Sequence, residues 1–267
     1  MLILLKLGGS LITDKNTPQT VDGVRLARLC AEIHRAYQDN PAAQLILGHG
    51  SGSFGHMPAR KYRTRDGVHS RDEWLGFVEV WQQARALNSA VLTALHAAGL
   101  PAVAFPVSAA GRRTLNGKIE WDLSTIKAAL NQRLLPVVYG DVLFDDRLGG
   151  TIISTEEIFE HLAGTLSVDR ILIAGKEAGV YSDFPANKQV IPKISPANII
   201  EVSASLRGSE SVDVTGGMAA KVHSMLSLTA NQPGLTVRIF SGLEAESVYR
   251  AICGEPIGTL ISQEQGG

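Results

Sequence analysis

Short apolar runs alternate with amphipathic stretches along most of this chain. Residues 22–37 carry apolar side chains at helical spacing, with arginine and glutamate between them, and are predicted to form a helix. Continuous apolar runs are typical of strands buried on both faces of a parallel sheet; they occupy residues 2–7, 45–47, 134–139 and 170–174. The chain therefore opens with a predicted strand, helix and strand, which favours parallel pairing and a right-handed crossover.

The rest of the chain repeats this rhythm. Helices are expected at 74–98, 124–132, 156–166 and 244–253 and from 213–218 through Thr229, with strands at 101–107 and 236–240 and a closing edge strand at 258–261. Asn116-Gly117 marks a hairpin turn within 108–122, residues 60–71 indicate a loop or lid, and 185–196 indicate a surface excursion. Because no change of composition divides the chain, we expect one α/β domain with a largely parallel sheet.

Composition narrows the class of partner. The 267 residues are 45% hydrophobic and 19% charged, with a formal net charge of −1. This balance gives no basic footprint for nucleic acid or an anionic membrane, and no apolar run reaches the ~18 residues of a membrane span. The two cysteines, Cys30 and Cys253, lack metal-ligand spacing and are expected to be reduced thiols of a cytoplasmic protein. A small molecule is the expected partner.

A glycine-rich segment follows the second predicted strand. Residues 48–56 contain four glycines and two serines and end in His56. Without Cβ atoms, successive backbone N–H groups can converge on an anion, and the imidazole adds a hydrogen bond or a positive charge near neutral pH. The segment is therefore predicted to be a phosphate-binding loop. A surface turn with an uninvolved histidine is the alternative, because one glycine-rich loop is a weak signal.

A second glycine turn ends the first predicted strand. Lys6 lies within that apolar run, Gly8-Gly9-Ser10 follows it, and Lys15 comes a few residues later. Parallel strands place their carboxyl ends at one edge of the sheet, so both glycine turns are expected at the edge where ligands bind. A strand lysine whose ammonium group reaches solvent is the alternative interpretation of Lys6.

The second half of the chain offers a third glycine turn. Gly216-Gly217 precedes the predicted helix that carries Lys221, which suits a phosphate at a helix N-terminus, although an exposed helix lysine is the alternative. Phosphoryl transfer between two substrates depends mostly on the placement of cations and N–H donors. Two lobes that each supply two loops suit that reaction; the loops are 8–15 and 48–56 in one lobe and 175–181 and 213–221 in the other.

Two other helices carry candidate residues. Thr155 is expected to cap the helix 156–166, whose first turn holds Glu156 and Glu157 where the helix dipole favours negative charge. Capping alone and a functional role are both open for these two acids. The helix 74–98 has an aromatic face next to the glycine-rich segment. This face consists of Trp74, Phe77, Val78 and Trp81. Two interpretations are open for it: packing in the core, or the lining of an apolar substrate pocket.

Taken together and in order, four motifs resemble the amino acid kinase superfamily. They are Lys6-Leu-Gly-Gly-Ser10, the glycine-rich segment, Gly140-Asp141, and Asp213-Val-Thr-Gly-Gly-Met218 with Lys221, and they span nearly the whole chain. Within the superfamily, Ile12-Thr-Asp-Lys15 and Ser53-Phe-Gly-His56 resemble isopentenyl phosphate kinases. The resemblance implies an open αβα sandwich, a homodimer, and transfer of the γ-phosphoryl group of ATP to isopentenyl phosphate with Mg²⁺.

The resemblance also implies roles for single residues. Lys6 and Lys221 would bracket the moving phosphoryl group, with Glu156 as the acid that organises the lysines. Lys15 would assist on the phosphate chain, and His56 would bind the acceptor phosphate. The residues expected around ATP are Lys6, Gly8, Gly9, Ser10, Ser51, Gly52, Lys176, Gly179, Gly216, Gly217 and Lys221. Those expected around the acceptor are Gly50, Ser51, Gly55, His56, Gly140, Asp141 and Gly150, with the aromatic face of helix 74–98 around its tail.

Three positions depart from the family pattern. Gly50-Ser51-Gly52 replaces a triple glycine, Glu156 replaces an aspartate, and Glu177-Ala-Gly-Val-Tyr181 replaces an Asp-Gly-Val-Tyr loop. Three functions stay open: an isopentenyl phosphate kinase, a sibling kinase acting on uridylate, fosfomycin or glutamate, and a non-catalytic nucleotide-binding protein of the same fold. The three lysines favour an enzyme, since a simple binding protein needs fewer converging cations.

Overall fold

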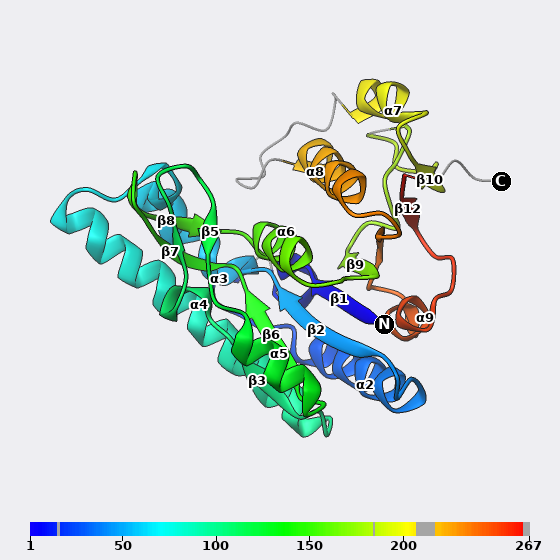
Figure 1. Ribbon diagram of the computed structural model, residues 1–267, viewed down its shortest axis with the longest axis horizontal. Helices are drawn as coiled ribbons and strands as arrows, with labels where there is room; N and C mark the ends of the chain where they lie inside the picture. The colour runs from blue at the N-terminus through cyan, green and yellow to red at the C-terminus, as the bar shows by residue number, and fades with distance from the viewer. Residues whose placement is uncertain (15–16, 184, 207–216, 264–267) are drawn as a thin grey trace.

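The first strand, β1 (Leu2–Leu7), lies inside an eight-stranded sheet (Figure 1). The strand order is β10-β12-β11-β9-β1-β2-β6-β3. The other strands are β2 (Gln44–His49), β3 (Ala102–Ala104), β6 (Leu135–Tyr139), β9 (Arg170–Gly175), β10 (Lys193–Ile194), β11 (Thr236–Ser241) and β12 (Thr259–Ile261). Within the described chain, β11 and β12 are the one antiparallel pair of this sheet, so the expectation of a largely parallel sheet is confirmed.

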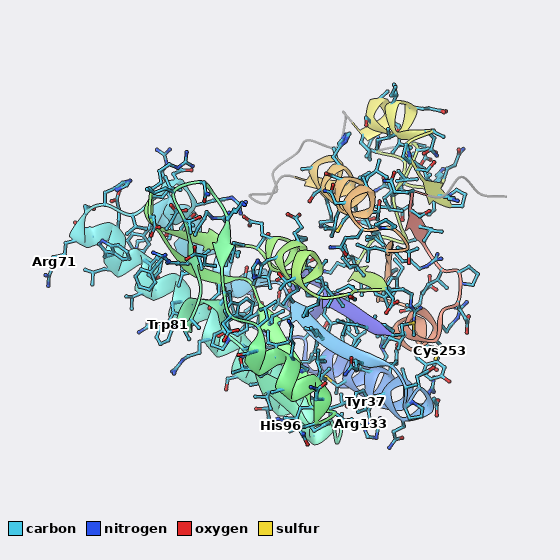
Figure 2. All side chains as sticks on the ribbon, viewed as in Figure 1. Tyr37, Arg71, Trp81, His96, Arg133 and Cys253 are labelled. Carbon is cyan, nitrogen blue, oxygen red and sulfur yellow. The ribbon has the colours of Figure 1, made fainter. Side chains whose placement is uncertain are left out.

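The computed structural model describes residues 1–14, 17–183, 185–206 and 217–263, and leaves the side chains of 56–58 and 60 outside that description. No helix in these ranges is long and apolar enough to cross a membrane. Cys30 and Cys253 are both free thiols, as expected; Cys30 is buried in the helix at residues 23–39, and Cys253 lies on the surface (Figure 2).

Helices cover both faces of the sheet because its strands alternate their side chains between two cores. Leu2 and Leu4 pack with the helices of one layer, α5 (Ser124–Asn131), α6 (Thr155–Thr165) and α8 (Gly217–Asn231). Ile3, Leu5 and Leu7 pack with those of the other, α2 (Gly23–Asp39), α4 (Arg71–Ala97) and α9 (Ser247–Cys253). This arrangement confirms the αβα sandwich, and the alternation turns Lys6 toward the layer of α6 and α8.

A second, four-stranded sheet stands beside the first, in the order β5-β4-β7-β8. It consists of β4 (Arg112–Arg113), β5 (Ile119–Glu120), β7 (Asp141–Asp145) and β8 (Gly149–Ile153). The expected hairpin around Asn116-Gly117 is present as β4 and β5. No strand was expected over residues 141–153, where the apolar runs, 142–144 and 152–153, are short and lie between polar residues.

Two segments expected to be loops are helical. The glycine-rich segment 48–56 is a loop only at Gly50 and Ser51, since β2 runs to His49 and α3 (Gly52–Tyr62) starts at Gly52. Likewise, α1 (Gly9–Ile12) starts inside the first glycine turn. The expected lid at 60–71 is shorter, because α3 includes residues 60–62 and a 3₁₀ turn, η1 (Thr64–Asp66), follows.

Other element boundaries differ for local reasons. Ser154, not Thr155, caps α6, because its hydroxyl accepts from Glu157 N while the Glu157 carboxylate accepts from Ser154 N. Strand β12 is internal, because β10 adds outside it. The predicted strand 101–107 shrinks to β3, with a 3₁₀ turn η2 (Val107–Ala109) after it. Helix α7 (Ile199–Leu206) was not expected.

Helix α2 forms hydrogen bonds with the C-terminal half of the chain. The buried carboxylate of Glu32 accepts from the backbone N–H groups of Glu246 and Val248 at 3.1 and 2.9 Å, at the start of α9. Arg28 donates to the carbonyl of Gly242 at 2.6 Å. At the end of α2, Tyr37 packs under the guanidinium of Arg133, which lies 5.6 Å from the ring centroid (Figure 2). These contacts fix α2 against the loops on either side of it.

Candidate active site

The site lies where the chain leaves β1 at its carboxyl end. The partners of β1 are β2 on one side and β9 on the other, and both pairs are parallel. The chain therefore adds its first strands on one side of β1 and its later strands on the other side. In open α/β sheets, the crevice at such a change of side is where ligands bind. Lys6 is 7% exposed here, opposite Gly48 of β2 and Ile173 of β9.

Gly48 lets α6 settle directly onto the sheet beside Lys6. A Cβ at Gly48 would lie 2.6 Å from Thr155 and 2.7 Å from the ring of Phe159, so any larger residue would push α6 away. Thr155 Oγ1 also donates to the carbonyl of His49 at 2.7 Å. The first turn of α6 is therefore held against the end of β2, which brings Glu156 over Lys6.

Glu156 connects two lysines from distant parts of the chain. Lys6 Nζ donates to Glu156 Oε1 at 2.7 Å, and Lys221 Nζ lies 3.4 Å from the same oxygen. Burial by itself would raise the pKa of the Glu156 carboxyl, but the positive charges of Lys6 and Lys221 outweigh it and lower the pKa to about 2. The carboxylate is thus fully ionised at neutral pH and holds both ammonium groups.

Lys221 reaches this point because α8 packs beside α6. Val222 and Met225 are buried in the shared core of this layer. One turn further along both helices, Ser224 donates a hydrogen bond to the carboxylate of Glu160. The placement of Lys221 therefore depends on helix packing, which its sequence neighbours alone do not specify.

The two glycine turns touch each other through their backbones. A Cβ at Gly9 would lie 2.1 Å from Gly52 N, and one at Gly52 would lie 2.5 Å from Gly9 O. Gly52 also has φ +49°, whereas Ser51 has φ −79°, so the serine in place of the family's glycine meets no backbone penalty. Thr13 locks the contact, because its hydroxyl donates to Gly9 O at 2.8 Å and accepts from Ser53 N at 3.0 Å.

The backbone N–H groups at this contact divide into two sets. Gly8 N donates to Ala174 O at 2.8 Å and Gly50 N donates to Leu7 O at 3.0 Å, which corrects the expectation that Gly8 offers its N–H to a phosphate. In the described chain, a second set of N–H groups has no hydrogen-bond acceptor and forms a candidate donor set for an anion. These groups belong to Gly9, Ser10, Ser51 and Gly52, of which Gly9 and Gly52 are buried against each other.

Gly140 and Asp141 lie next to this region but serve the second sheet. Asp141 is 1% exposed and accepts from Ser108 Oγ at 2.5 Å and from Val142 N at 2.8 Å. Burial raises the pKa of its carboxyl to about 6, against the opposing effect of these hydrogen bonds. The Asp141 carboxylate therefore links η2 to β7 through hydrogen bonds. Sequence analysis missed Ser108, which carries no motif of its own.

Three of the four aromatic-face residues of α4 gather around the second sheet. Trp74 and Phe77 lie 5.1 Å apart between ring centroids, and both contact Phe144 of β7. A Cβ at Gly150 would lie 2.9 Å from Phe77, so this glycine makes room for the ring. Trp81 packs against the same core, but Val78 is 44% exposed and does not join it.

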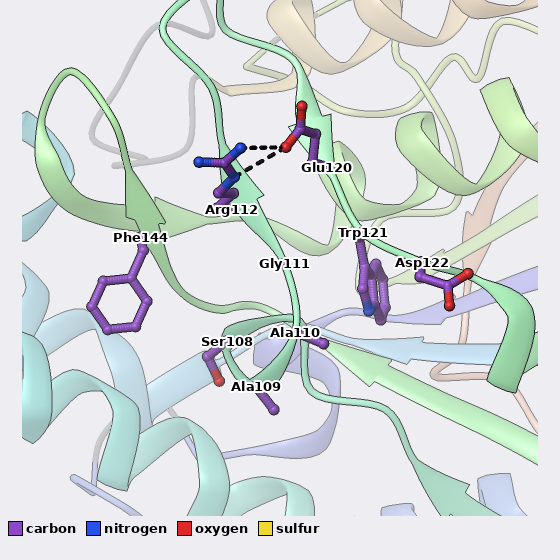
Figure 3. A pocket seen from close by; sticks show the side chains of 9 residues that line it. All are labelled: Ser108, Ala109, Ala110, Gly111, Arg112, Glu120, Trp121, Asp122 and Phe144. Carbon is purple, nitrogen blue, oxygen red and sulfur yellow. Dashed lines mark hydrogen bonds and ion pairs between the residues drawn. The ribbon is translucent and has the colours of Figure 1, made fainter.

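Phe144 also borders a cavity of about 490 Å³ beside the hairpin (Figure 3). Ser108 lies at its base, and Trp121 and Asp122 form another side. The Arg112–Glu120 ion pair closes the upper edge at 2.8 Å. None of the lysines near Glu156 lines this cavity, so it is separate from the charged centre.

Some of the remaining expected residues lie within the described structure and others lie outside it. Lys176 and Gly179 follow β9; the Lys176 carbonyl accepts from Ser241 Oγ at 3.2 Å, and Gly179 packs against Thr259 and Val190. Gly55 lies in α3 against Ser51, and Gly217 starts α8. Lys15 and Gly216 lie outside the described residues, and for His56 only its place in α3 is described.

Comparisons with known proteins agree with this geometry. A model of the amino acid kinase family matches residues 1–241. The isopentenyl phosphate kinases of Methanocaldococcus jannaschii and Haloferax volcanii are 37% and 34% identical, and each match covers 98% of this chain and at least 98% of the relative. The chain belongs to the isopentenyl phosphate kinases of the amino acid kinase family.

A solved isopentenyl phosphate kinase structure superposes with a TM-score of 0.81 at 30% identity, over 98% of this chain and all of the other. Because the match covers both halves of the chain, it includes the elements that carry Lys6, Glu156 and Lys221. The open αβα sandwich implied by the motifs is therefore shown by both sequence and structure. As a member of this kinase family, the protein uses ATP as a substrate.

The contact between the glycine turns gives the first prediction. Gly9→Ala should unfold the protein or destabilise it by more than about 3 kcal/mol, because its Cβ must displace the backbone of Gly52. Gly23→Ala is the matched control, since a Cβ there meets nothing within 4 Å. Urea unfolding of both variants measures the effect, and similar stability of the two would contradict the close backbone contact.

The lowered pKa of the Glu156 carboxyl gives the second prediction. Its ionised form stabilises the fold fully above the ordinary pKa of 4.5, and this contribution is lost as pH falls toward about 2. Glu156→Gln should thus cost on the order of 3 kcal/mol near neutral pH, and the difference from wild type should shrink through that window. Unfolding measured across pH tests this, with Glu120→Gln, which breaks an exposed ion pair, as the control. A difference in unfolding free energy between Glu156→Gln and wild type that does not change with pH would contradict the lowered pKa.

Proposed function

We propose that the protein transfers the γ-phosphoryl group of ATP to isopentenyl phosphate, which gives isopentenyl diphosphate and ADP. The observation that carries this proposal is the pair of lysines on Glu156, beside N–H groups at the carboxyl end of β1 that have no acceptor among the described residues. Preorganised cations and N–H donors are what phosphoryl transfer needs, since charge spreads over the equatorial oxygens of the moving group. The relatives supply the identity of the acceptor.

In this proposal the two lysines flank the moving phosphoryl group. Lys6 is fixed by the sheet and Lys221 by α8, so the group would pass between elements from the two halves of the chain. The N-terminal lobe, about residues 1–165, would bind the acceptor, and the C-terminal lobe, about 166–267, would bind ATP. Lys15, Gly216 and Gly217 remain proposed contacts to the phosphate chain.

His56 is proposed to recognise the acceptor phosphate and not to act as a base. A phosphate monoester is largely ionised at neutral pH, with a second pKa near ~6, so no base is needed to create the nucleophile. A donor is needed instead, because two anionic substrates repel each other. The position of His56 on α3, one turn after Gly52, supports a place near the N–H groups at the start of that helix that lack an acceptor in the described residues.

The aromatic cluster is proposed to meet the isoprenoid tail. Trp74, Phe77 and Phe144 form an apolar surface that α4 and β7 share, and Phe144 is half exposed, at 50%. Apolar surface of this kind favours a hydrocarbon chain over a nucleoside or an amino acid. It supports isopentenyl phosphate over uridylate or glutamate as the acceptor.

Mg²⁺, a homodimer and a cytoplasmic location complete the proposal. In the described part of the chain, no three His, Cys, Asp or Glu side chains are placed to hold a metal ion. The described residues therefore offer no site of three or more such ligands for Mg²⁺, and we assign the ion no protein ligand and no step. Sedimentation equilibrium tests the dimer, and a monomer at assay concentrations would contradict it.

An ADP-release assay across four acceptors tests the function. Isopentenyl phosphate should give much the highest kcat/KM, with uridylate, fosfomycin and glutamate near background. His56→Gln should retain far more activity than His56→Ala, with the loss in the KM for isopentenyl phosphate and not in that for ATP. Higher activity on another acceptor would make the protein a sibling kinase. Absence of ADP release with all four would favour a nucleotide-binding protein.

A further inference from the structure

His49 is a second histidine near the site and is enclosed on all sides. It is the last residue of β2, it is 1% exposed, and its ring stacks on Tyr139 at 5.4 Å between centroids. Its Nδ1 lies 3.2 Å from the carbonyl oxygen of Gly50, and its Nε2 lies 3.2 Å from the side-chain oxygen Oδ1 of Asn88 on α4. The ring is thus fixed between the turn after β2 and the middle of α4.

The surroundings leave the imidazole neutral and restrict where its proton lies. Burial lowers the pKa of His49, and the nearby charge of Lys6 lowers it further, while the bonds to Gly50 and Asn88 oppose them. A neutral imidazole has one N–H and one acceptor nitrogen. The Gly50 carbonyl can only accept, whereas a half-turn of the Asn88 amide offers an NH₂ donor in place of its oxygen. Both contacts are satisfied only if Nδ1 carries the proton.

This bond orients the next peptide unit. In a trans peptide the N–H points opposite to the preceding C=O, so a Gly50 carbonyl held toward His49 turns the Ser51 N–H away from the His49 ring. The Ser51 N–H is one of the groups without an acceptor in the described residues. On the other side, Gly50 N is fixed by Leu7 O at 3.0 Å. The peptide between Gly50 and Ser51 is therefore held in one orientation before any substrate arrives.

We propose that His49 is a positioning residue, which holds the Gly50–Ser51 peptide so that the Ser51 N–H faces the acceptor phosphate, and that the Gly50 carbonyl sets the imidazole tautomer, which the Asn88 amide turns to complement. The part that concerns the acceptor rests on the proposed function. A donor fixed in advance costs no ordering when the phosphate binds. Loss of His49 should therefore weaken acceptor binding and leave ATP binding unchanged.

Substitutions at His49 separate this role from a merely structural one. Asparagine places its amide nitrogen close to the position of Nδ1, so His49→Asn should keep the bond to Gly50 and remain near wild type. His49→Leu fills similar space without a donor and should raise the KM for isopentenyl phosphate about tenfold, the effect of about 1.4 kcal/mol, with the KM for ATP unchanged. His96→Leu, at the far end of α4 (Figure 2), is the matched control.

The ring itself can be observed without any activity. Nitrogen NMR of protein labelled in histidine, with the His49 signals assigned by their loss in His49→Asn, should show a neutral ring protonated at Nδ1. A ring protonated at Nε2, or equal changes of both KM values in His49→Leu, would overturn the inference. If the wild-type protein fails to phosphorylate isopentenyl phosphate, the proposed function falls, and the tautomer alone decides whether His49 holds the peptide.

Discussion

The carboxylate of Glu156 is the interaction on which the rest of the site depends. Two ammonium groups brought to one crevice repel each other, and Lys6 is almost fully buried, so neither would stay in place without a nearby negative charge. Glu156 supplies that charge to both lysines from one oxygen. In the proposed reaction, the cations are therefore ordered before substrate binds, and they would stabilise the charge of a phosphoryl group without further reorganisation.

Backbone contact between glycines makes this arrangement possible. Gly48 allows α6 to approach the sheet, and Gly9 and Gly52 allow the two turns to touch, so the starts of three helices meet at the end of β1. The N–H groups there that lack an acceptor in the described residues add to the two lysines. The proposed site for anions thus depends on close packing as much as on charged side chains.

The sequence predicted the parts of this picture that are encoded locally. The buried β1 with Lys6, the amphipathic α2 and the glycine turns were all expected, and their order indicated the fold. Tertiary contacts determine what was missed. The glycine-rich segment predicted a loop, but α3 begins at Gly52 because the N–H of Ser53 finds the hydroxyl of Thr13, a partner distant in sequence.

The hydrogen bonding of the backbone N–H groups of Gly8 and Gly9 also depends on tertiary contacts. Gly8 and Gly9 are indistinguishable in the sequence, yet sheet pairing uses the N–H of Gly8 and leaves that of Gly9 unpaired in the described residues. The short β7, β8 and β10 were missed because their apolar runs are short and bounded by polar residues or glycine, and pairing with neighbouring strands stabilises them. His49 was passed over in favour of His56, since only the fold places it between Gly50 and Asn88.

The central claim is that Lys6, held by Glu156, acts on the phosphoryl group in transit more than on bound ATP. Single-turnover transfer to isopentenyl phosphate by Lys6→Ala tests this most directly, beside the exposed-lysine control Lys188→Ala and with ATP affinity measured separately. The account predicts a transfer rate lower by about 100-fold or more, because a charge that stabilises the transition state is lost, and an ATP dissociation constant close to that of wild type. A normal transfer rate together with lost ATP binding would contradict it.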